Sequence, residues 1–254
     1  MGAWGMSTER LEEMRRLLLA AYAEGGMWGI GAPERPLPDG LARGSETHLA
    51  FLTLVFAISG GRNPVQLWAA ARDTFQADPE LFNPTFLAYA TPKMLISRLT
   101  AYSLIRKPHS ESVVWQRIGQ ALVMRAGGLV RQLVEAQGRE GNRLLAYLQQ
   151  NKTTFPVLSG RQTAPRWIYG LAFAGDVEIT GADGLPVPVS PAVRQAMRNL
   201  DVAGDRVTTA VFGPLDLLGR YGCRKRAQSA TLCPVADSCP VARFCRYGYQ
   251  AETL

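Results

Sequence analysis

The chain has 254 residues, of which 47% are hydrophobic and 19% charged, and 28 Lys and Arg residues outnumber 21 Asp and Glu residues. This composition is that of a folded globular protein, and no apolar run is long enough to predict a membrane span. The polar N-terminal segment is unlike a signal peptide, so we expect a cytoplasmic protein. The net charge of +7 favours a polyanionic partner, although a charge of this size also serves solubility alone.

Apolar residues at helical spacing predict helices along most of the chain, beginning with residues 8–24. Residues 25–44 are rich in Gly and Pro and predict a long irregular loop. Further helices are predicted over residues 48–58, 63–75, 79–90, 92–105, 111–126, 128–150, 161–174, 190–200 and 206–222. Residues 176–190 are the one strongly extended piece. The sequence therefore predicts an all-α fold.

All four cysteines of the chain lie between residues 223 and 245, at Cys223, Cys233, Cys239 and Cys245. Disulfides are rare in cytoplasmic proteins, so this cluster of thiols predicts a metal site. The wide spacing, with a proline after Cys233 and Cys239, favours a [4Fe-4S] cluster. Zinc, which usually takes closer pairs of cysteines, remains the alternative.

The same segment is rich in basic residues, with Arg224, Lys225 and Arg226 directly after the first cysteine. Arg220, Arg243 and Arg246 add to this charge, and within the segment only Asp237 opposes it. Such side chains suit the phosphates of DNA. The other interpretation is that they offset the negative charge of the thiolates.

A helical chain with a C-terminal four-cysteine loop resembles the endonuclease III branch of the helix-hairpin-helix (HhH-GPD) DNA glycosylase superfamily. Of that family's ligand spacing, only the final gap agrees. Residues 158–164, LSGRQTA, look like the hairpin of the family, and residues 187–193, VPVSPAV, align with its VDTHV stretch. Residues 58–64, ISGGRNP, stand where the family has its first DNA-facing loop.

The resemblance implies double-stranded DNA as the partner and a two-lobed helical fold. The hairpin residues Gly160, Arg161, Gln162 and Thr163 would contact DNA, and Arg62 would lie at the tip of the DNA-facing turn. The resemblance also implies an N-terminal segment over residues 1–46, which packs on the second lobe, and a helical lobe over residues 47–150. A hairpin lobe would follow over 151–222, and an iron-sulfur loop over 223–254. We expect a monomer that does not bind membranes and associates with the nucleoid.

Two positions depart from the family's chemistry. Gln162 stands where bifunctional members have the lysine that forms a Schiff base, and Ser190 stands where they have the catalytic aspartate. An amide is no such nucleophile, and a hydroxyl carries no charge to stabilise a cationic sugar. Two alternatives remain, a monofunctional DNA N-glycosylase with other catalytic residues and an inactive lesion-binding protein. An iron-sulfur electron carrier unrelated to DNA is a third.

Other residues offer further candidates for these roles. Substitutes for the missing groups would be Asp176, Glu178, Asp183 or Lys152, whereas His48 and His109 suggest neither a hydrolytic triad nor a histidine metal site. The helical patterns place Trp68, Trp115 and Trp167 in the core. Trp4 and Trp28, in the N-terminal segment, are free in this interpretation to stack on a base.

Overall fold

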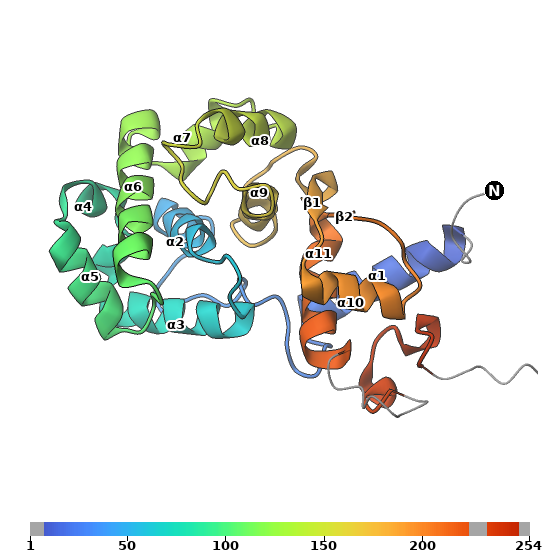
Figure 1. Ribbon diagram of the computed structural model, residues 1–254. Coiled ribbons are helices and arrows are strands. Elements are labelled where there is room, and N and C mark those ends of the chain that lie inside the picture. The colour runs from blue at the N-terminus through green and yellow to red at the C-terminus, as the bar shows by residue number, and fades with distance from the viewer. Residues whose placement is uncertain (1–7, 224–232, 249–254) are drawn as a thin grey trace, which may run out of the picture. The chain divides into compact units, whose positions relative to one another are not determined.

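The computed structural model describes residues 8–223 and 233–248 and consists mainly of helices (Figure 1). It divides into two compact units: unit 1 comprises Met1–Ala32 and Pro186–Leu254, and unit 2 comprises Pro33–Leu185. The boundary after the first lobe therefore lies at residue 185, whereas the sequence analysis placed it at residue 150. Among the described residues, no helix is long and apolar enough to cross a membrane.

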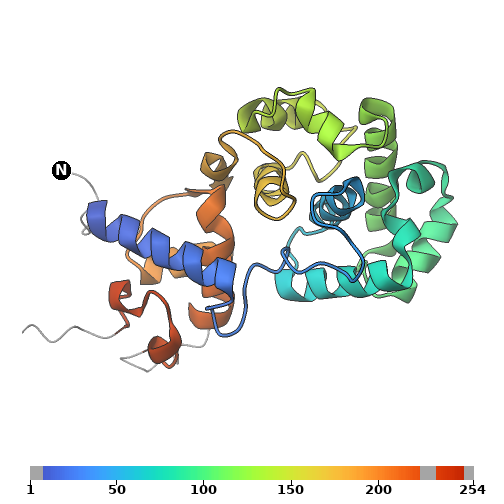
Figure 2. The same cartoon turned by 180° about the vertical axis from the view of Figure 1, so that it is seen from behind.

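Unit 2 holds most of the helices. They are α2 (Glu46–Ala57), α3 (Pro64–Ala77), α4 (Pro84–Tyr89), α5 (Pro92–Ala101), α6 (Pro108–Ala126), α7 (Val130–Glu135), α8 (Gly141–Gln150) and α9 (Thr163–Phe173). Two short 3-10 turns, η1 (Pro79–Phe82) and η2 (Ala182–Gly184), complete it. Figures 1 and 2 both show α2 and α9 side by side, with the other helices of the unit around them.

Helix α2 is the centre of the unit because its residues are apolar on every side, a pattern typical of a fully buried helix. Gly170 brings α9 close to it, since a Cβ at this position would overlap the ring of Phe56. The two helices are also joined by a hydrogen bond of 2.9 Å from Trp167 Nε1 to Thr53 Oγ1. The placement of Trp68, Trp115 and Trp167 in the core is confirmed, since each is at most 2% exposed.

Several predicted helices are shorter or divided. Asn83 accepts hydrogen bonds from the N–H groups of residues 85 and 86 and caps a new helix before Pro84, so residues 79–90 form η1 and α4. Positive φ values at Gly138 and Arg139 separate α7 from α8. The irregular loop over residues 25–44 is confirmed, with a single isolated bridge between Met27 and Ile30.

Unit 1 contains α1 (Thr8–Glu24), α10 (Pro191–Asn199) and α11 (Thr209–Leu217), which continues into the π-helical turn η3 (Leu218–Gly222). Strands β1 (Pro186–Pro188) and β2 (Arg206–Thr208) pair in antiparallel fashion, with Val187 opposite Val207. The first strand lies in the predicted extended piece, whereas the second occupies the start of a predicted helix. The 3-10 turns η5 (Ala236–Ser238) and η6 (Ala242–Phe244) follow.

Two glycines allow the helices of unit 1 to pack closely. A Cβ at Gly213 in α11 would overlap the side chain of Tyr22 in α1. A Cβ at Gly219 in η3 would overlap the backbone of Ala192 in α10. Because both lie on the segment that leads to Cys223, α11 and η3 set the place of the first cysteine.

Candidate metal centre and nucleic-acid interface

The described cysteine segment, residues 233–248, begins with a six-residue unit that occurs twice in succession. Residues 233–238 read CPVADS and residues 239–244 read CPVARF, and each unit forms a turn that ends in η5 or η6. The backbone bonds repeat as well, since Ala236 N–H donates to Cys233 O and Ala242 N–H donates to Cys239 O. The repeat explains why the last two gaps between cysteines are equal, a signal that the sequence analysis did not use.

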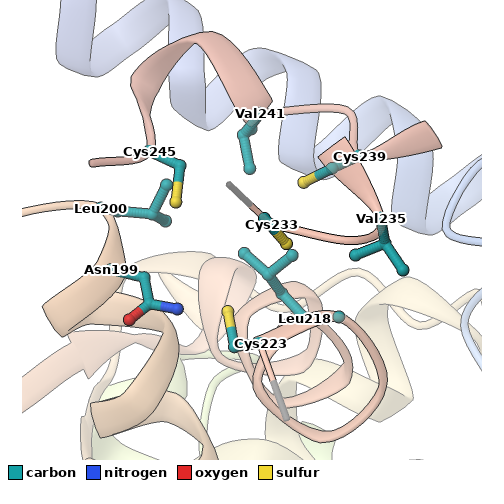
Figure 3. A pocket seen from close by; sticks show the side chains of 10 residues that line it. Asn199, Leu200, Leu218, Cys223, Cys233, Val235, Cys239, Val241 and Cys245 are labelled. Atoms are coloured by element: carbon teal, nitrogen blue, oxygen red, sulfur yellow. The ribbon is translucent and has the colours of Figure 1, made fainter. Parts of the chain in front are cut away.

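The four cysteines line one pocket, whose volume of about 300 Å³ includes space open to solvent (Figure 3). Its other walls are apolar or small apart from one amide: Asn199, Leu200, Leu218, Gly222, Val235 and Val241. Burial raises the pKa of the Cys223 thiol to about 12 and that of Cys239 to about 11, and it also raises the pKa of Cys245. The thiolate forms therefore need a cation beside them.

An all-sulfur donor set suits soft metals, and zinc and iron-sulfur clusters are among the groups that fit it. Zinc at about 2.3 Å from each of four sulfurs would require sulfurs about 3.8 Å apart. Within the described residues, no three His, Cys, Asp or Glu side chains are arranged to hold one metal ion. A cluster of several irons spreads its ligands more widely, because each thiolate binds an iron of its own. The four thiols that line the pocket are the donors that such a cluster takes.

Helix α1 contacts the cysteine segment through η6. Arg243 forms an ion pair of 2.5 Å with Glu13, and Arg10 donates to the carbonyl of Arg243 over 3.2 Å. The guanidinium groups of Arg10 and Arg243 also lie over the Phe244 ring, 5.6 and 5.0 Å from its centroid. These contacts join the N-terminal helix to the C-terminal loop.

Trp28 makes a second connection to the cysteine segment. Its indole N–H donates to Ser238 Oγ over 3.0 Å, and its ring packs where Gly222 has no side chain. The interpretation that Trp28 is free to stack on a base is therefore wrong, because the indole is already engaged. Trp4 lies outside the described residues.

The described basic side chains of this region are paired. Arg220 binds Asp216, one helical turn earlier. Arg243 binds Glu13 and Arg246 binds Asp201, two acids that lie outside the cysteine segment. The remaining three predicted DNA contacts in this region lie outside the described residues: Arg224, Lys225 and Arg226.

The predicted hairpin lies between α8 and α9, which pack against each other in unit 2. Gly160 donates to the carbonyl of Val157 over 2.9 Å, and a Cβ at Gly160 would lie at 2.9 Å from that oxygen. The turn leads into α9 with Gln162 at the N-cap, and α9 has no acidic residue in its first turn. Among the described residues, no backbone carbonyl in a turn or loop accepts from the N–H group of Arg161 or Thr163. These features make the positive end of α9 available to an anion.

The hairpin side chains differ in exposure. Arg161 is exposed and Thr163 is 8% exposed. The arginine is therefore the residue of the hairpin whose charge is directly open to a ligand.

Ser190 is the N-cap of α10 and is buried. Its hydroxyl accepts from Val193 N–H over 3.1 Å and donates to Asp216 Oδ1 over 2.9 Å. Asp216 is 5% exposed, and its second oxygen pairs with Arg220 Nε at 2.6 Å. Ser190, which the sequence analysis aligned with the family's aspartate, thus contacts a buried carboxylate from α11. Sequence reasoning missed Asp216, although it is the one acid in the apolar run of residues 210–219.

Arg62 does not lie at an exposed tip. It is 9% exposed, and its Nη1 donates to the carbonyl of Leu104 over 2.6 Å. Burial lowers the pKa of its guanidinium. The prediction that Arg62 is exposed is therefore wrong. Contact with DNA would require the hydrogen bond to Leu104 to break.

The four candidate substitutes for the missing catalytic groups are exposed: Lys152, Asp176, Glu178 and Asp183. His109 is exposed as well, whereas His48 is fully buried. Burial lowers the pKa of His48 to about 4, and its Nδ1 accepts from Gly44 N–H over 3.1 Å. His48 is therefore a neutral core residue.

No protein-family model and no curated protein sequence matches the chain. Solved structures do match it. One of them is described as a non-covalent endonuclease III–DNA complex, with a TM-score of 0.55 and 14% sequence identity. The match covers 96% of this chain and 97% of that chain. The chain therefore has an endonuclease III-like fold.

Replacing Asp216 by Ala should lower the free energy of unfolding by about 3 kcal/mol, because it leaves Arg220 half-buried without its partner. Urea denaturation followed by circular dichroism measures the loss. The matched control is Glu12→Ala, which removes an exposed pair with Arg15 and should cost less than about 1 kcal/mol. Equal losses in the two variants would contradict a structural role for the buried pair.

Proposed function

We propose that this chain binds double-stranded DNA and holds a [4Fe-4S] cluster on Cys223, Cys233, Cys239 and Cys245. The observation that carries the proposal is the convergence of these cysteines on one apolar pocket, in a chain with an endonuclease III-like fold. The matching structure is a complex with DNA, which supports nucleic acid as the partner.

The cluster is favoured over zinc by the ligand arrangement. The pocket presents only sulfur donors, and their arrangement in the described residues does not suit a single ion. Cys223, Cys233, Cys239 and Cys245 would hold such a cluster, which would supply one-electron transfer. The chain's own contribution is to bring Cys223 from η3 to the segment that carries the other three ligands.

Protein purified without oxygen should contain about four iron and four sulfide ions per chain and absorb visible light, as expected for a single cubane cluster. Colorimetric iron and sulfide analysis measures the content. Cys239→Ser should reduce the cluster content strongly, because the chain contains no fifth cysteine to replace the ligand. Stoichiometric zinc without visible absorbance would contradict the cluster.

DNA binding is supported by the hairpin and its exposed arginine. Among the described residues, no turn or loop carbonyl accepts from the N–H groups of Arg161 and Thr163, and the first turn of α9 has no acid. A phosphate oxygen would supply the missing acceptor at the positive end of the helix. Such contacts hold the DNA backbone and read no base, so binding through them is independent of sequence.

Affinity for a duplex should fall steeply with salt, and Arg161→Ala should lower the slope of log K against log salt by about 1. Fluorescence anisotropy of a labelled duplex across a salt series measures the slope. The control is Arg125→Ala, which removes an exposed charge from the end of α6 and should leave the slope less affected. The double variant Arg224→Ala with Arg226→Ala tests the cysteine region separately. An Arg161→Ala slope equal to that of the control would move the interface elsewhere.

Base release without strand cleavage is a second candidate function, and Asp216 favours it. Gln162 offers no amine for a Schiff base, so strand cleavage through this residue is excluded. A carboxylate near Ser190 would stabilise the positive charge that grows on the sugar as the base leaves. The ion pair with Arg220 offsets part of the negative charge of Asp216. This pairing favours the alternative of an inactive lesion-binding protein.

Duplexes that contain uracil, oxidised, alkylated or mismatched bases decide between the two. For the enzyme, one lesion should give alkali-labile sites with no borohydride-trapped adduct, and Asp216→Asn should slow release at least about tenfold. Asp201→Asn, an exposed acid of the same unit, is the control and should leave release unchanged. Activity that appears only in Ser190→Asp would instead show a binding protein on a glycosylase scaffold.

A further inference from the structure

Asn199 contributes an amide to the wall of the cysteine pocket. It is the last residue of α10 and is 6% exposed. The other described side chains of the wall are cysteine thiols or aliphatic groups. A buried amide in apolar surroundings costs free energy unless its polar atoms are bonded, so the partners of Asn199 indicate what it does there.

The two ends of the Asn199 side chain have different partners. Its Oδ1 accepts from Gln195 Nε2 over 3.1 Å, one helical turn earlier. Its amide N–H group is left to face the Cys223 thiol, whose pKa is lowered by the Asn199 side chain against the larger effect of burial. Figure 3 shows the amide nitrogen on the side of Cys223 and the oxygen turned away from it.

Asn199 also contacts the other end of the cysteine segment. Its backbone carbonyl accepts from Arg246 N–H over 2.9 Å, directly after Cys245. The C-terminal residue of α10 therefore touches the first cysteine through its side chain and the neighbour of the last cysteine through its backbone.

The Asn199 amide offers the Cys223 sulfur a hydrogen-bond donor, as backbone N–H groups do for two other cysteines. The Cys239 sulfur is hydrogen-bonded to the backbone of Val241, and the Cys245 sulfur to the backbone of Tyr247 and Gly248. These donors come from the turns that follow each cysteine. Cys223 instead ends a helical segment and receives its donor from another helix.

We propose that Asn199 is a positioning residue for the cluster, which fixes the Cys223 sulfur and raises the reduction potential through its N–H···S hydrogen bond. The proposal rests on the cluster of the proposed function. A hydrogen bond to a ligand sulfur stabilises negative charge there, and the reduced cluster carries one more negative charge than the oxidised one. Removal of the donor should therefore disfavour reduction.

The test is the reduction potential of the cluster-loaded protein, measured by voltammetry or by a redox titration read by electron paramagnetic resonance. Asn199→Leu removes the donor at similar volume and should shift the potential to a more negative value. Asn199→Asp keeps the shape but places a carboxylate beside the sulfur, and it should shift the potential further in the same direction. Gln195→Leu, which only releases the amide, should give a smaller shift of the same sign.

Asn142→Leu is the matched control, because it removes an exposed amide from α8 and should leave the potential unchanged. Iron and sulfide are measured in every sample. A wild-type protein without iron overturns the cluster and this inference together. A normal cluster content with unchanged potentials in the Asn199 and Gln195 variants overturns the inference alone and assigns Asn199 to packing.

Discussion

The convergence of four partly buried thiols on one largely apolar pocket is the constraint on which unit 1 depends. Thiols in such surroundings ionise only when a cation compensates the charge, as the raised pKa values of Cys223, Cys239 and Cys245 indicate. The regular structure of residues 233–248 consists of two short 3-10 turns, and Val241, Ala242 and Phe244 are the buried hydrophobic residues of this segment. Contacts from α1 and α10 therefore help to position this segment, and residues of α10 and η3 line the cysteine pocket.

The same elements connect the pocket to the other features of unit 1. Helix α10 begins at Ser190, beside the buried Asp216, and ends at Asn199, in the wall of the pocket. Helix α11 carries Asp216 and continues through η3 to Cys223. A change at the cysteines would therefore affect the residues at both ends of α10. The hairpin belongs to unit 2, where it lies between α8 and α9.

The parts of the fold that could be predicted from sequence are those set by local rules. Proline and capping residues mark helix starts, and the apolar pattern placed three tryptophans in the core. The four cysteines also pointed to one site because they are close in sequence. The division of residues 79–90 depended on one cap at Asn83, which a continuous apolar pattern conceals.

What the sequence could not provide are partners distant along the chain. The bond between Ser190 and Asp216 spans 26 residues, and that between Trp28 and Ser238 spans 210. Arg62 looked exposed because it stands in a glycine turn, and only the fold brings the Leu104 carbonyl to it. Asn199 carries no sequence signal, since a helix-end asparagine is ordinary until a cysteine lies beside it.

Anomalous diffraction from anaerobically grown crystals, collected on both sides of the iron absorption edge, tests the central claim most directly. The account predicts strong iron signal inside the pocket bounded by Cys223, Cys233, Cys239 and Cys245, with density for four metal positions, as expected for a cubane cluster. A single peak at the zinc edge, or two disulfides in place of metal, would contradict it.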